Sequence, residues 1–142
     1  MQIKKKQAVL AFSFLILFVL SACCPKEGKI LITDVKTATG VDEKLMPVGP
    51  TAVFPEGTSR VFCWFQWKDA KVDTQVTAKW LYVTDDIRVL DYTFNIPRKQ
   101  GSGSVSLAMP EDKKLPSGTY RVDLTLGNRL LKSLTFKVGE TK

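Results

Sequence analysis

Any chemistry in this chain depends on its three cysteines and its carboxylates, because its 142 residues include no histidine. Histidine is the commonest general base and the commonest metal ligand, so its absence weakens both roles. Asp85-Asp86 falls in a stretch typical of a turn, and Glu111-Asp112 would point to opposite faces of a strand. Neither pair has the spacing of a calcium loop. We therefore predict no catalytic, cofactor-binding or metal-binding residues; the alternative, a hydrolase, would depend on one of these carboxylates.

The N-terminal leader has the layout of an export signal. Met1–Lys6 carries three lysines and no acid, and the 13-residue stretch Ala8–Leu20 that follows is almost entirely apolar. A bilayer-spanning helix needs about 20 apolar residues, so this stretch has the length of a signal-peptide core instead. The small residues Ser21 and Ala22 then precede Cys23. The layout predicts a signal that is removed at this point.

Leu20-Ser21-Ala22-Cys23 resembles the lipobox of bacterial lipoproteins, where signal peptidase II cuts just before a cysteine that receives lipid. The resemblance implies palmitate-type acyl chains on Cys23 and a protein anchored to the membrane of the cell envelope. In a Gram-negative cell, Cys24 at the next position would imply sorting to the outer membrane. Two alternatives stay open: a plain secretory signal cut near Ala22, and an uncleaved anchor.

These signals divide the chain into a signal peptide (1–22), a lipidated cysteine with a short tether (23–29) and one domain (30–142). The polar tether Pro25–Lys29 spans at most ~18 Å when extended. The leader holds three of the 21 basic residues, so the remaining chain has 18 basic and 14 acidic residues, a net of +4. These basic residues form no run in the sequence, which predicts no nucleic-acid binding.

Alternating apolar residues dominate the chain after the tether. Together with the turn-forming stretches between them, they predict an all-β antiparallel sandwich of about seven to eight strands. Residues 36–50 have no clean period and are expected to form a long connection, and Gly101-Ser102-Gly103 is expected to be a flexible hairpin tip. The expected strands are 30–35, 51–54, 61–67, 75–83, 90–96, 105–109, 120–126 and 134–138.

Two markers resemble immunoglobulin-like folds. Trp80 lies in mid-strand 17 residues after Cys63, as a core tryptophan would, and Pro116–Val122 places Tyr120 at a tyrosine corner. The domain also resembles immunoglobulin-like modules of bacterial lipoproteins through Phe54-Pro55, Phe65-Gln66-Trp67 and Trp80-Leu81-Tyr82. No second cysteine lies near Tyr120, so the inter-sheet disulfide of antibody domains cannot form. Cys63 either pairs with Cys24 or, as we favour, is a small buried hydrophobe.

The alternation also predicts a candidate binding surface. If Val61, Cys63, Phe65 and Trp67 face the core, then Phe62 and Trp64 point outward, and Leu81 does so on the next strand. Such a stripe could bind an envelope protein or a glycan. In the alternative, the segment 30–54 or a loop covers it.

Taken together, these patterns predict a membrane-anchored, non-catalytic binding or accessory module at the cell envelope. The alternative is a structural or assembly subunit that packs its outward aromatic face against a neighbour.

Overall fold

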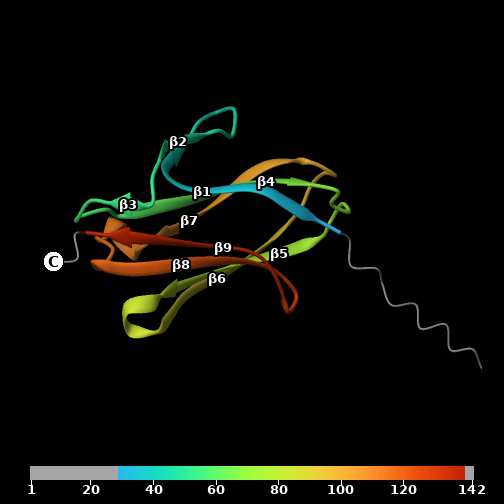
Figure 1. Ribbon diagram of the computed structural model, residues 1–142. Coiled ribbons are helices and arrows are strands. Elements are labelled where there is room, and N and C mark those ends of the chain that lie inside the picture. The colour runs from blue at the N-terminus through green and yellow to red at the C-terminus, as the bar shows by residue number, and fades with distance from the viewer. Residues whose placement is uncertain (1–28, 140–142) are drawn as a thin grey trace, which may run out of the picture.

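The computed structural model describes residues 29–139, which form two stacked β-sheets (Figure 1). The first sheet has the order β2-β1-β4-β7, and the second has the order β3-β9-β8-β5-β6. All paired strands are antiparallel except β3 and β9. The prediction of an all-β sandwich is confirmed. The strands are β1 (Leu31–Val41), β2 (Pro47–Pro50), β3 (Val53–Phe54), β4 (Arg60–Lys68), β5 (Gln75–Tyr82), β6 (Ile87–Asn95), β7 (Gly101–Ala108), β8 (Gly118–Leu126) and β9 (Arg129–Val138).

The core lies between the two sheets and follows the alternation of the sequence. On β4, the four residues Val61, Cys63, Phe65 and Trp67 are all buried in it. Trp80 on β5 packs edge-on against Phe136, with ring centroids 6.1 Å apart. Alternate residues of a strand point to the same face, so the period-2 pattern is enough to select this core. Within residues 29–139, no helix is long and apolar enough to cross a membrane.

The segment 36–50 corrects one expectation, because it is a hairpin and not a long connection. β1 continues to Val41, and β2 pairs with it after a turn at Asp42. The Asp42 carboxylate accepts hydrogen bonds from the backbone N–H groups of Lys44 and Met46, both at 2.9 Å. A register shift early in β1 breaks the alternation, and the prolines of β2 are tolerated because it is an edge strand.

Gly101-Ser102-Gly103 is a second correction, because it begins strand β7 and is not a hairpin tip. Gly101 pairs with Trp67, and Gly103 pairs with Phe65. A Cβ atom added at Gly101 would lie only 3.0 Å from Cζ2 of Trp67. These glycines therefore leave room for two core rings that lean over β7 from the neighbouring strand.

Cys63 is a buried free thiol in the centre of β4. Burial raises the pKa of this thiol to about 12, so it stays protonated and unreactive at neutral pH. This burial is what the role of a small core hydrophobe predicts. Cys23 and Cys24 lie outside the described residues.

Tyr120 makes the hydrogen bond that defines a tyrosine corner. Its hydroxyl donates to the carbonyl oxygen of Pro116 at 2.6 Å, and its ring stacks on Phe136 with centroids 5.2 Å apart. Tyr82 lies beside it, 4.9 Å between centroids, and its hydroxyl donates to the Ser117 carbonyl. The hydroxyl groups of these two tyrosines thus hold the chain in place at the start of β8.

Trp80, the other marker, is fully buried, and its indole N–H has no hydrogen-bond partner.

We expect the Tyr120 corner to give a pH-dependent contribution to stability. Burial, with a smaller contribution from Tyr82, raises the pKa of Tyr120 to about 12, against about 10 in an unfolded chain. The unfolded chain therefore loses this proton first, and stability should fall between about pH 10 and pH 12. Tyr120→Phe should lose about 1 kcal/mol at neutral pH and should lack this part of the fall. Urea unfolding of both proteins across this range measures the difference; parallel curves would contradict it.

Candidate functional site

Trp64 points away from the core but does not reach the surface. Its side chain is only 2% exposed, and its indole N–H donates to the backbone carbonyl of Leu45 at 2.6 Å. The Lys36 ammonium lies 5.6 Å from the centre of the same ring. The turn between β1 and β2 therefore covers this tryptophan. Trp64 points outward, as the alternation predicts, and of the two alternatives for its exposure the structure shows cover by the segment 30–54.

Phe62 and Leu81 do not extend this face into a common surface. Phe62 lies on β4 in the first sheet, whereas Leu81 lies on β5 in the second sheet, and both are half-buried. The sequence predicted two outward stripes but could not show that they belong to opposite sheets. The candidate binding surface of Phe62, Trp64 and Leu81 is therefore not a single exposed patch.

The carboxylate pairs form no chemical centre. Asp85 and Asp86 lie at a short 3-10 turn before β6, and Glu111 and Asp112 lie in a second one after β7. Among residues 29–139, no group of three or more acidic or cysteine side chains is arranged to hold a metal ion. Nothing in this geometry supports acid–base chemistry at these residues.

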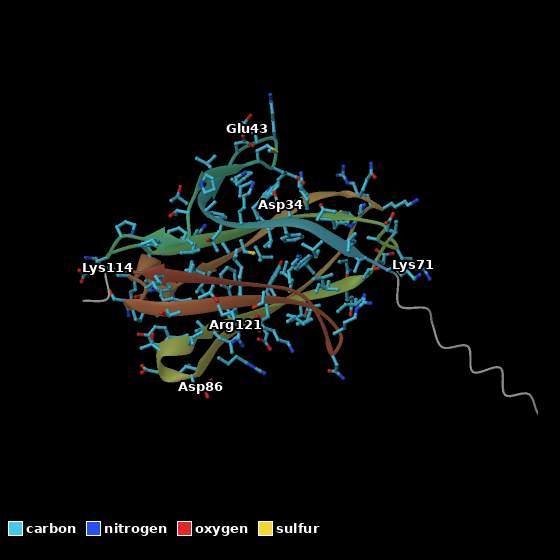
Figure 2. All side chains as sticks on the ribbon, viewed as in Figure 1. Asp34, Glu43, Lys71, Asp86, Lys114 and Arg121 are labelled. Atoms are coloured by element: carbon cyan, nitrogen blue, oxygen red, sulfur yellow. The ribbon has the colours of Figure 1, made fainter. Side chains whose placement is uncertain are left out.

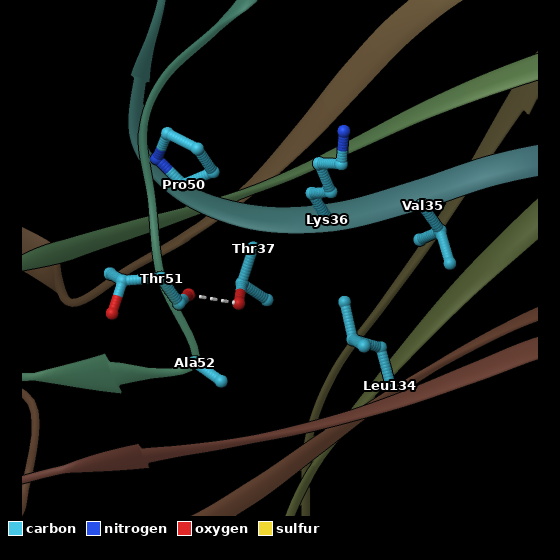
Figure 3. Close-up of a pocket in the computed structure, with 7 residues that line it drawn as sticks. All are labelled: Val35, Lys36, Thr37, Pro50, Thr51, Ala52 and Leu134. Carbon is cyan, nitrogen blue, oxygen red and sulfur yellow. Dashed lines mark hydrogen bonds between the residues drawn. The ribbon is translucent and has the colours of Figure 1, made fainter.

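A shallow hollow of about 310 Å³ lies where the chain crosses between the sheets, beside β1 and β9 (Figure 3). Val35 and Leu134 face each other across it, and the Thr37 hydroxyl donates to the carbonyl of Thr51. Its polar groups are thus satisfied within the protein, and Lys36 is the only charged residue in its lining. This hollow has no convergent groups that could orient a ligand.

The opposite side of the sandwich is open, because β6 extends beyond the first sheet. The register pairs Phe94 with Val76, Tyr92 with Ala78 and Leu90 with Trp80, so these β6 residues share the inner face. The first sheet ends at β7 and leaves this face uncovered. We call the exposed part the β6 ledge; it consists of Ile87, Val89, Leu90 and Tyr92, of which Tyr92 is 53% exposed.

Four aromatic rings connect the ledge to the core. Trp67 and Phe65 have centroids 5.8 Å apart, Phe65 and Phe94 are 5.4 Å apart, and Phe94 stacks on Tyr92 at 6.2 Å. Rings at these distances and tilts interact favourably beyond their buried area. The inner rings therefore hold Phe94 and Tyr92 in place, and the exposed apolar ledge has a defined shape.

Two apolar hollows lie along this side, between β6 and the segment from β7 to Tyr120. The first, of about 210 Å³, is lined chiefly by Phe65, Trp67, Tyr92, Phe94 and Gly103. The second, of about 180 Å³, is lined chiefly by Ile87, Val89, Met109, Leu115 and Tyr120. No charged side chain lines either hollow. We call the ledge, the two hollows and the free edge of β7 the side groove.

The free edge of β7 lacks the features that normally protect a sheet edge. Edge strands usually carry charges or prolines, or are very short. Of the other three edges, β2 has two prolines, β3 has two residues, and β6 has Arg88 and Asp91. By contrast, Gly101–Ala108 has eight residues with no charge and no proline. Within the described chain, β7 pairs only with β4, so its other side presents unpaired backbone groups.

The sequence contains the alternation and the uncharged strand that make this groove, but it does not show the strand order that exposes them. Leu90, Tyr92 and Phe94 alternate as a buried strand does, and Leu90 and Tyr92 are exposed because the facing sheet ends at β7. The segment 101–108 carries no charge, and the expectation of a flexible tip at Gly101-Ser102-Gly103 hides its role as an edge strand. An edge strand can be recognised only after the strand order is known.

Comparison with solved structures identifies the architecture. The chain is similar to an immunoglobulin-like protein from Pseudomonas aeruginosa, with a TM-score of 0.55 and 16% identity over 80% of this chain and 98% of that one. The fold is immunoglobulin-like. A DNA-bound alkylpurine DNA glycosylase from Pseudomonas fluorescens aligns at a TM-score of 0.47 with 14% identity, over 80% of this chain and 31% of its own. Searches by sequence match no family model and no curated protein.

Proposed function

We propose that this protein is a membrane-anchored lipoprotein whose immunoglobulin-like domain binds an extended polypeptide segment of an envelope partner. The observation that carries the binding role is the unprotected edge of β7 beside the apolar β6 ledge. The anchoring role is supported by the leader and by Leu20-Ser21-Ala22-Cys23. The domain acts without catalysis.

The chemistry of the edge favours a polypeptide as the ligand. A row of unpaired N–H and C=O groups is matched along its length only by another extended backbone, as in β-strand addition. β7 has eight residues, which gives an added strand about 26 Å of pairing length. Alternate side chains of that strand would point down into the groove, where the apolar hollows select hydrophobic residues.

A photo-crosslinking amino acid at Ser104 tests this binding role in cells. Ser104 lies on β7 and lines the first hollow, whereas Thr135 is exposed on β9 of the other sheet and serves as the control position. We expect crosslinks from position 104 to map to one extended segment of an envelope protein, and none to it from position 135. Crosslinks only to a second copy of this chain would favour the assembly alternative and contradict the proposal.

The anchor has its own test in Cys23→Ala. This variant should accumulate as unprocessed precursor and incorporate no labelled palmitate, because the residue that receives the lipid is gone. Cys24→Ala is the matched control, and it should be cut and acylated like the wild type. Normal processing of Cys23→Ala would instead indicate a plain secretory signal.

A further inference from the structure

Charge is distributed unevenly between the two ends of the sandwich. The start of β1 and the loops 69–74, 96–100 and 127–128 all lie at one end, as the strand register requires. We call this the leader-proximal end, because the chain enters the domain there. With the residues that flank these loops, it holds Asp69 and Asp73 and six exposed basic residues, a net of +4: Lys29, Lys68, Lys71, Arg98, Lys99 and Arg129.

The far end has the opposite sign. Residues 55–60, 83–86 and 110–117 contribute five acidic and three basic side chains, a net of −2. Figure 2 shows the two ends, with Lys71 at one and Lys114 and Asp86 at the other. This polarity is not visible in the sequence, because the basic residues come from four separate segments and form no run.

We propose that the leader-proximal end docks on the anionic phospholipid surface of the membrane in which the protein is anchored. This inference rests on the proposed lipid anchor at Cys23. The chain from Cys23 to Lys29 is six residue steps long, at most ~22 Å when extended, and so keeps this end close to the lipid. Attraction between exposed charges extends roughly 8 Å at physiological salt, and a tether this short lets the basic loops approach anionic headgroups to within that range. Val72, at the tip of loop 69–74, is 55% exposed and adds an apolar contact beside Lys71.

Docking in this way would orient the side groove. Because the loops at the leader-proximal end contact the membrane, the strands stand along its normal. The Gly101 end of β7 then lies nearest the lipid, and the Ala108 end lies farthest away. The extended partner segment would therefore run outward from the membrane surface, as a segment next to a membrane-embedded or membrane-anchored region does.

Hydrogen exchange of the acylated protein on vesicles tests this docking. Exchange in loops 69–74 and 96–100 should be at least threefold slower on vesicles with 30% phosphatidylglycerol than on phosphatidylcholine alone. The difference should vanish in 0.5 M NaCl, because salt screens such contacts. It should also vanish in the triple variant Lys71→Glu/Arg98→Glu/Lys99→Glu. The matched control, Lys44→Glu/Lys113→Glu/Lys114→Glu, makes the same change in charge elsewhere on the domain. It should still show the slower exchange on anionic vesicles.

Three outcomes separate docking from anchoring. Equal exchange on both vesicle types, with the protein floating on both, contradicts docking and leaves the anchor intact. If the protein fails to float on neutral vesicles, the anchor is contradicted. In that case, docking would still be supported if anionic vesicles slow exchange in these loops and salt restores the faster exchange. If millimolar glycerol 3-phosphate alone slows the same loops, the end is a site for a single headgroup and surface docking is wrong.

Discussion

Trp64→Ala should lower the free energy of unfolding by about 3–5 kcal/mol, the range for removing a buried tryptophan. The ring is enclosed although it lies outside the central core, because the turn between β1 and β2 closes over it. The variant should lose the packing of this turn and leave the carbonyl of Leu45 without its indole donor. Urea unfolding of the variant and the wild type measures the change.

Trp64→Phe separates the two contributions. It keeps most of the apolar contact but removes the hydrogen bond to Leu45, so we expect a loss of about 1–2 kcal/mol. In both variants, backbone amides of residues 42–46 should exchange faster than in the wild type, since the turn loses its support. A loss below 1 kcal/mol for Trp64→Ala, with unchanged exchange in the turn, would mean that the hairpin does not depend on this ring.

Tyr92→Lys should weaken partner binding at the side groove at least tenfold with only a small effect on folding. The residue lies on the β6 ledge, half-exposed and stacked on Phe94, so the substitution should reduce stability by about 1 kcal/mol. A lysine there would place a charge where an added strand must bury apolar side chains, and this is how natural sheets protect such sites. Crosslinking yield from Ser104 and the dissociation constant of the partner peptide both report the effect.

Val53→Lys is the matched control for Tyr92→Lys. Val53 is 60% exposed and lies on β3, at the opposite edge of the same sheet. The control makes the same kind of change, an exposed apolar residue to lysine, but far from the groove. If the two variants reduce binding equally, the effect comes from charge in general and the groove is not the binding site.

The alternation of the sequence was enough to predict the class of fold and most of its core. Val61, Cys63, Phe65 and Trp67 face inward as expected, because period-2 patterning records the pleat of a strand directly. The ends of strands were harder to predict where the alternation is interrupted. β1 contains a register shift, and β7 begins with glycines that leave space for the aromatic rings of β4.

The candidate site could not be predicted because it depends on which strands lie at the edges. Trp64 and Tyr92 illustrate this dependence. Trp64 alternates out of phase with the core and points outward, but a hairpin distant in sequence covers it. Tyr92 alternates in phase with the core, but no strand of the facing sheet covers it. Burial on a strand is decided by its neighbours as well as by its own pattern.

Hydrogen exchange of the β7 amides, measured on the acylated protein with and without the partner peptide identified by crosslinking, tests strand addition most directly. If the peptide pairs with β7, the outward-facing amides between Gly101 and Ala108 should exchange at least tenfold more slowly in the complex. The amides of Val48 and Gly49 on the β2 edge should not change. A complex that forms with no slowing along β7 would contradict strand addition at this edge.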